Sequence, residues 1–114
     1  MAAAHELRGE FVRVEGYPVT VNDAAVATRV TEVAAELLGA DASRVMAEPL
    51  MGAEDFSYVL EQVPGAMAFL GACPPELEPA TAPGNHSNLV VFDEDALPVG
   101  VAVYAAMALD ALAG

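Results

Sequence analysis

Residues 66–72 constrain the fold more than any other part of this sequence. Their letters, AMAFLGA, form a continuously apolar run, with Gly65 before it and Gly71 near its end. A short apolar run bounded by glycine is typical of a β-strand that is buried on both faces. Such a strand needs neighbouring strands in a sheet and helices that cover the sheet.

Other segments could supply these neighbours. Residues 9–21 and 44–50 have strand-like patterns, and residues 56–63 have helical spacing that Pro64 ends. A longer helix is predicted after an N-cap at Asn22 or Asp23, ending at Gly39. Its apolar positions are Val26, Val30, Val33, Leu37 and Leu38.

A proline-rich loop over residues 74–85 is followed by a last predicted helix over residues 95–112. Its expected inner stripe is Leu97, Val101, Tyr104, Ala108 and Leu112. The alternation of strands and helices predicts an α/β fold, with helices layered on a small sheet. Because so small a sheet leaves open edges, we expect it to be part of a larger one.

Charge excludes some functions. The net charge is −13, with four arginines and no lysine, and such a surface repels nucleic acid and anionic membranes. The apolar run from Leu97 is interrupted by Pro98 and Gly100, which argues against a membrane span. No signal peptide is visible, so a cytoplasmic location is expected. Cys73 is the single cysteine, and a buried structural thiol is its expected role.

The first candidate site is the stretch MGAEDF, residues 51–56. Gly52 is expected to open a helix whose free N–H groups could hold a substrate carboxylate. Glu54 and Asp55 fit two roles. They could complement the helix dipole, which is the commoner case, or one of them could orient a metal-binding histidine or contact a substrate amine.

The second candidate site is the loop PGNHSN, residues 83–88. His86 is flanked by small polar residues, and neutral imidazole is the commonest metal ligand in proteins. A metal site needs three or four ligands, however, and no second histidine lies near in sequence. On spacing alone, a hydrogen-bonded surface histidine is the more frequent situation.

Four motifs occur in order along the chain: YPVTVND, MGAEDFSYVLEQVPGAMAFLG, NHSN and FDEDALPVGVAVYAAMAL. Together they resemble the C-terminal end of metal-dependent amidohydrolases of the aminoacylase and carboxypeptidase G superfamily. The similar branch contains hippurate hydrolase, N-acyl-amino-acid amidohydrolase and the auxin-conjugate hydrolases. This resemblance covers nearly the whole chain.

The resemblance implies a two-domain, zinc-peptidase-like fold. Residues 1–20 would end the lid or dimerisation domain, and residues 21–114 would form the C-terminal segment of the catalytic domain. It also implies a divalent metal cofactor, zinc, manganese, nickel or cobalt, with two ions in the complete enzyme. The implied substrate is an N-acyl amino acid or a similar amide, and a homodimer is one implied assembly.

The resemblance also assigns roles to residues. His86 matches the final metal-ligand histidine of the family, although Asn88 stands where the family usually has proline. Gly52, Glu54 and Asp55 match the loop beside the substrate. The family's general base and other metal ligands have no counterpart here, because the chain has no Glu-Glu pair and no Cys-x-His.

Two functions follow as hypotheses. In the first, the chain is the C-terminal part of such an amidohydrolase, inactive alone and completed by a missing N-terminal half. No catalytic residue is then expected within the chain itself. In the second, it is a non-catalytic remnant that acts as an interaction or assembly module through an open sheet edge.

Overall fold

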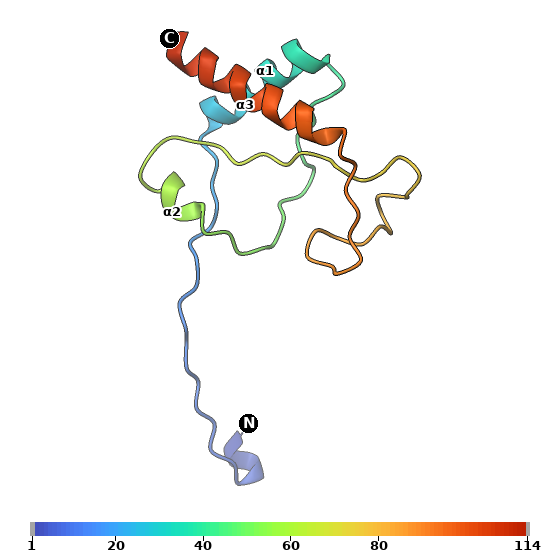
Figure 1. The fold of residues 1–114 in the computed structure, drawn as a ribbon. Coiled ribbons are helices and arrows are strands. Elements are labelled where there is room, and N and C mark those ends of the chain that lie inside the picture. Colours follow the sequence, from blue (N-terminus) through green and yellow to red (C-terminus); the bar gives the residue numbers. More distant parts are fainter. Residues whose placement is uncertain (1, 114) are drawn as a thin grey trace.

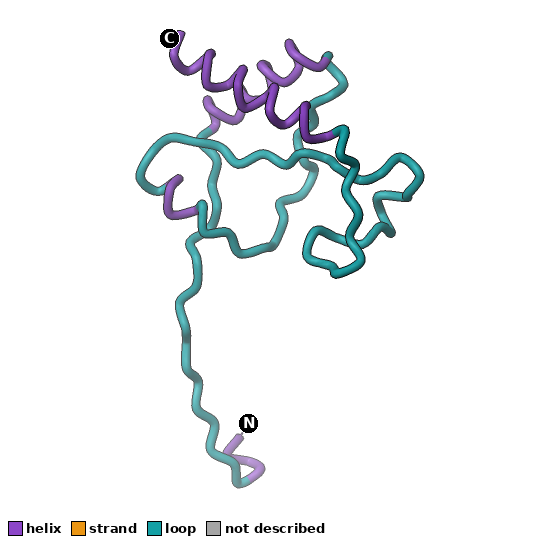
Figure 2. The backbone as a smooth tube through the Cα atoms, in the orientation of Figure 1, coloured by secondary structure: helices purple, strands orange, loops and turns teal. Residues whose placement is uncertain are grey.

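The computed structural model describes residues 2–113. In chain order the helices are the 3-10 helix η1 (Ala2–His5) and the α-helices α1 (Ala24–Leu38), α2 (Ser57–Leu60) and α3 (Ala96–Ala113). Helices α1 and α3 lie against each other at one end of the molecule (Figure 1). The backbone between the helices is loop, drawn in teal in Figure 2.

Helix α1 begins and ends at its capping residues. The Asp23 carboxylate accepts hydrogen bonds from the backbone N–H groups of Ala25, at 2.9 Å, and Val26, at 3.0 Å. This arrangement satisfies donors of the first turn. Gly39 ends the helix with a φ of 99°, which glycine adopts without strain. The predicted helix, its N-cap at Asp23 and its end at Gly39 are therefore confirmed.

Helix α3 lies where the sequence predicts it, and it begins at Ala96 rather than Asp95. A turn precedes it, in which the Asp93 carboxylate accepts the Asp95 N–H at 3.0 Å. Pro98 lies in the first helical turn, where its missing N–H removes no intrahelical hydrogen bond. The predicted position of this helix is confirmed.

A bidentate ion pair joins α1 to α3. The Arg29 Nε–H donates to Asp110 Oδ2 at 2.9 Å, and the Nη2–H donates to Oδ1 at 2.5 Å. The Nη1 group of Arg29 also lies 3.0 Å from Glu32 and 3.5 Å from Glu36. Two parallel N–H···O bonds fix the orientation of guanidinium and carboxylate, so this pair sets which face of α3 meets α1.

The predicted inner stripe of α3 is wrong. Leu97, Val101 and Tyr104 are 67%, 70% and 83% exposed. The half-buried positions lie on the other side of the helix and are Ala96, Val99, Gly100, Ala102, Val103, Ala106, Met107 and Asp110. Because α3 is apolar around its whole circumference, hydrophobic spacing could not distinguish its two faces.

The predicted α/β fold is also wrong, because residues 2–113 contain no strand and no sheet. Backbone hydrogen bonds join the region of the expected strand over residues 66–72 to other segments at two points. The Gly65 carbonyl accepts the Asp23 N–H at 2.9 Å, and the Ala72 carbonyl accepts the Asp93 N–H at 2.9 Å. A strand requires a repeated ladder of such bonds, which these isolated contacts do not provide.

The Asn22 side chain makes a further link to this apolar segment. Its Nδ2–H donates to the Met67 carbonyl at 3.0 Å, and its Oδ1 accepts the Met67 N–H at 2.9 Å. The side-chain amide of Asn22 thus makes the two hydrogen bonds to Met67 that the backbone of a neighbouring strand would make in a sheet. The start of α1 is thereby tied to the apolar segment without any strand pairing.

The molecule is open. Among the residues whose burial is described, the buried apolar side chains are those of Val33 and Pro74. The radius of gyration is 19.6 Å, against about 13 Å for a compact domain of this length. Part of the difference comes from the N-terminal segment, which projects away from the rest of the chain as an extended arm (Figure 1). The described residues therefore do not close a hydrophobic core around α1 and α3.

Within residues 2–113, α3 is the one helix long and apolar enough to cross a membrane, judged by length and composition alone. Core helices of soluble proteins pass the same test. The carboxylate of Asp110 lies in this helix and pairs with Arg29 of α1.

Candidate functional site

His86 lies in a pair of consecutive turns. The Ser87 N–H donates to the Gly84 carbonyl at 2.9 Å, which places His86 at the third position of a β-turn. Ser87 then opens a second turn, since its carbonyl accepts the Val90 N–H at 3.3 Å and its Oγ accepts the Leu89 N–H at 3.1 Å. His86 is exposed, so the double turn presents its imidazole to solvent.

The described residues do not assemble a metal centre around this imidazole. Across residues 2–113, no three His, Cys, Asp or Glu side chains are placed so that they could hold one ion. His86 can therefore supply a single ligand, and a metal centre would need further ligands from elsewhere.

Gly52 lies in an exposed loop and does not open a helix. Helix α2 begins five residues later, at Ser57, so the predicted helix start at Gly52 is wrong. A Cβ atom placed on Gly52 would meet nothing within 4 Å. The backbone here is accessible, but the N–H groups of a first helical turn do not lie at this glycine.

Glu54 and Asp55 form the turn that leads into α2. The Glu54 carboxylate accepts the Phe56 N–H at 3.3 Å, and its carbonyl accepts the Ser57 hydroxyl at 2.6 Å. The Asp55 carbonyl accepts the Tyr58 N–H at 3.0 Å. These contacts of Glu54 are local to the turn, and the N-cap residue of α2, Phe56, makes no side-chain capping hydrogen bond.

Ser57 is fully buried, and sequence reasoning gave it no role. Its hydroxyl is satisfied by the Glu54 carbonyl, which explains how a polar side chain can be buried here. The sequence signal that could have indicated its burial is the position of this small polar residue within the apolar helical pattern of residues 56–63.

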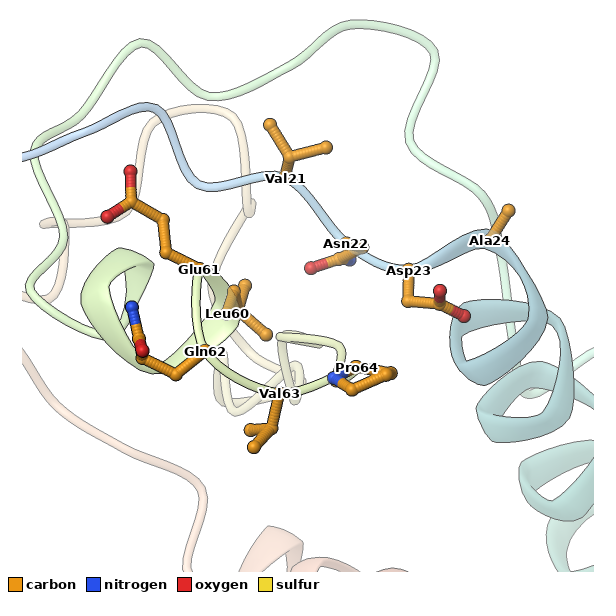
Figure 3. A pocket seen from close by; sticks show the side chains of 10 residues that line it. Val21, Asn22, Asp23, Ala24, Leu60, Glu61, Gln62, Val63 and Pro64 are labelled. Carbon is orange, nitrogen blue, oxygen red and sulfur yellow. The ribbon is translucent and has the colours of Figure 1, made fainter.

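No hydrogen bond or ion pair described for residues 2–113 joins the two candidate sites. Helix α2, which follows the first site, lies away from the turns around residues 84–90, drawn in orange in Figure 1. An open hollow of about 540 Å³ does lie between the start of α1 and the segment after α2 (Figure 3). Its lining consists of residues 21–24 and 60–65, so none of the four candidate residues contributes to it.

Asp110 has the clearest electrostatic perturbation among the carboxylates. The hydrogen bonds from Arg29 hold the pKa of the Asp110 carboxyl below its usual range, and the charge of Arg29 adds to this effect. The same bonds raise the pKa of Arg29, so both groups are charged at neutral pH. This pair lies between α1 and α3 and belongs to the helix contact, not to either candidate site.

Comparison with known proteins gives the family. Residues 7–110 match the family described as peptidase family M20/M25/M40. The chain belongs to this peptidase family. The resemblance to metal-dependent amidohydrolases of the aminoacylase and carboxypeptidase G superfamily is thereby confirmed at the level of the family.

Three relatives illustrate the range of the family. The chain is 41% identical over 92 residues to the IAA-amino acid hydrolase ILR1-like 6 of Arabidopsis thaliana, covering 81% of this chain and 19% of the relative. It is 38% identical over 93 residues to the Thermostable carboxypeptidase 2 of Saccharolobus solfataricus, covering 82% and 22%. It is 29% identical over 109 residues to the Putative amidohydrolase YhaA of Bacillus subtilis, covering 96% and 27%.

The chain therefore spans about a fifth of the length of the first relatives it matches. No solved structure matches it. These relatives are named as a hydrolase, a carboxypeptidase and a putative amidohydrolase.

Proposed function

We propose that this chain is part of a metal-dependent amidohydrolase that cleaves the amide bond of N-acyl amino acids or related conjugates. The observation that carries the proposal is the family match over residues 7–110. Relatives named as an IAA-amino acid hydrolase and a carboxypeptidase support an amide substrate that carries an amino acid.

His86 is the proposed metal ligand. Its support is chemical: an exposed imidazole on a hydrogen-bonded double turn can reach an ion held mainly by other residues. Zinc, manganese, nickel and cobalt all accept imidazole, and two ions are proposed for the complete enzyme. When bound, such ions would polarise the amide carbonyl and lower the pKa of a bound water molecule.

Gly52, Glu54 and Asp55 are proposed to lie beside the substrate. The open space around Gly52 would let a ligand approach the backbone closely. Glu54 would shape the loop, because its carboxylate and carbonyl both hold the turn before α2. The side chain of Asp55 is exposed at the same turn and would be accessible to a substrate.

The domain assignment follows from the same proposal. Residues 1–20 would belong to a lid or dimerisation domain, and residues 21–114 to the catalytic domain. The extended N-terminal arm in Figure 1 supports a boundary near this point. The chain alone would be inactive, because the general base and the other metal ligands would come from the rest of the enzyme.

The test is a chimera of the Thermostable carboxypeptidase 2, in which the whole 114-residue chain replaces the matching segment. The chimera is expected to release amino acids from N-acyl amino acids, to lose this activity with a chelator, and to regain it with a divalent metal. The 114-residue chain alone is expected to show no release. Chelator-insensitive activity of the chain alone would contradict the proposal.

A second candidate function, a non-catalytic assembly module, is favoured by the exposed apolar side chains of this chain. The sheet edge first expected to carry it is not formed by residues 2–113. This candidate predicts a stable complex that contains no metal and is unchanged by His86→Ala.

A further inference from the structure

The outward face of α3 carries a long apolar stripe. We define the α3 outer stripe as the exposed positions Leu97, Val101, Tyr104, Ala108 and Leu112. At a rise of 1.5 Å per residue it runs for roughly 22 Å along the helix. It carries no charged side chain, since Asp110, the one charged residue of α3, pairs with Arg29 of α1.

The opposite side of α3 is already occupied. The Arg29–Asp110 ion pair connects it to α1, and a Cβ atom on Gly100 would lie 3.0 Å from the Leu70 side chain. These contacts fix the rotation of the helix about its axis. The outer stripe therefore cannot turn inward without breaking the bidentate ion pair.

The area left exposed is large for a chain of this size. The accessible surface is 9783 Å², whereas a compact monomer of 11.7 kDa exposes about 5,900 Å². The excess, about 3,900 Å², belongs to the whole chain, including the extended N-terminal arm and the α3 outer stripe, and is several times the roughly 800 Å² that each partner buries in a standard interface. Surface on this scale is expected for a polypeptide that completes a hydrophobic core, not for a transient partner.

Charge distinguishes the candidate occupants. Two copies of this chain would bring together two bodies of net charge −13, which repel each other. The same charge repels an anionic membrane surface. By contrast, the chain spans about a fifth of its relatives, so a family member of their length contains several hundred further residues that could cover the stripe.

We infer that the α3 outer stripe is a docking surface for the part of a family M20/M25/M40 chain that these 114 residues do not contain. The occupant is an apolar helix or sheet face. Tyr104 is its main anchor, because it combines a large apolar ring with 83% exposure and can keep its hydroxyl at the rim. The inference rests on the proposed function only through the family membership.

The test uses the full 114-residue chain and a carrier, the Thermostable carboxypeptidase 2 from which the matching segment is deleted. Circular dichroism first establishes that the carrier is folded, and co-expression of both pieces replaces mixing if it is not. Light scattering and titration then measure the complex. A 1:1 complex is expected, weakened at least about tenfold by Tyr104→Asp or Val101→Asp.

The matched control is Leu7→Asp, because Leu7 and Leu97 are the same residue type with the same 67% exposure. Leu97→Asp is expected to weaken the complex strongly and Leu7→Asp much less. Equal effects of the two variants would overturn the inference. So would the absence of any complex with a folded or co-expressed carrier.

Other occupants give different results. A homodimer lost in Tyr104→Asp would assign the stripe to a second copy, and sedimentation with phosphatidylcholine vesicles lost in the same variant would assign it to a membrane. Either result would overturn the inference. Failure of the proposed function is separable, because it would appear as a complex that forms and depends on the stripe but releases no amino acid with any metal.

Discussion

The guanidinium of Arg29 and the carboxylate of Asp110 form a bidentate ion pair across 81 residues of sequence, with the Nε–H donating to Oδ2 at 2.9 Å. This pair is the specific polar link between α1 and α3. It fixes the rotation of α3, so it determines both which residues face α1 and which remain exposed.

Replacing Asp110 by Asn should loosen the contact between α1 and α3. The substitution keeps the shape of the side chain but removes the charge and one acceptor, so Arg29 loses its bidentate partner. We expect the melting temperature to fall by a few degrees and amide exchange in α3 to quicken. Glu36→Gln is the control, because that carboxylate lies 3.5 Å from Arg29 and is 69% exposed. An equal effect of both substitutions would show that the bidentate geometry is unimportant.

Acid should weaken the same contact in a defined direction. Because Arg29 lowers the pKa of Asp110 in the folded chain, the stabilisation is fully present above the unfolded pKa, about 4. It is lost as pH falls through the lower pKa of the folded state. Thermal unfolding between neutral pH and about pH 2 should show this loss, and the Asp110→Asn variant should lack this component. A wild-type curve parallel to that of the variant would contradict the assignment.

Val33→Ala should destabilise the folded chain around α1. Val33 is 5% exposed, and removing two buried carbon atoms costs about 1–2 kcal/mol in the free energy of unfolding. Val45→Ala is the matched control, because Val45 is 86% exposed and its truncation should change that free energy by less than about 0.5 kcal/mol. Chemical denaturation of both variants measures the difference. Equal values would mean that Val33 does not mark a packed contact.

Asn22→Ala should release the apolar segment at Met67. The Asn22 amide makes two hydrogen bonds to the backbone of Met67, and their loss at an exposed site should cost about 1 kcal/mol. Hydrogen exchange at the Met67 amide should accelerate, whereas Asn85→Ala should leave it unchanged. Unaltered protection in Asn22→Ala would show that the contact does not persist in solution.

Local signals in the sequence predicted local structure well. Asp23 and Gly39 cap the two ends of α1 through contacts with residues only a few positions away in sequence. Both ends of that helix could therefore be identified from the sequence. The turn around Gly84 and His86 is likewise encoded by adjacent small polar residues. These features need no partner from a distant segment.

Features that depend on distant segments could not be predicted in the same way. Residues 66–72 have the composition of a buried strand, but a strand forms only where a neighbour supplies a ladder of hydrogen bonds. The buried face of α3 was misassigned because apolar residues surround this helix on all sides. The ion pair between Asp110 and Arg29 of α1 determines which side of α3 faces α1, and this contact is distant in sequence. Gly52 was expected to begin a helix that in fact begins at Ser57.

Metal content tests the central claim most directly. In the carboxypeptidase chimera, the number of bound metal ions per chain can be measured by elemental analysis for the parent, for His86→Ala and for His5→Ala. His5 is the matched control, because it is the other histidine and lies outside the family match over residues 7–110. The account predicts that His86→Ala loses metal and amidohydrolase activity while His5→Ala keeps both. Full metal occupancy and activity in His86→Ala would contradict it.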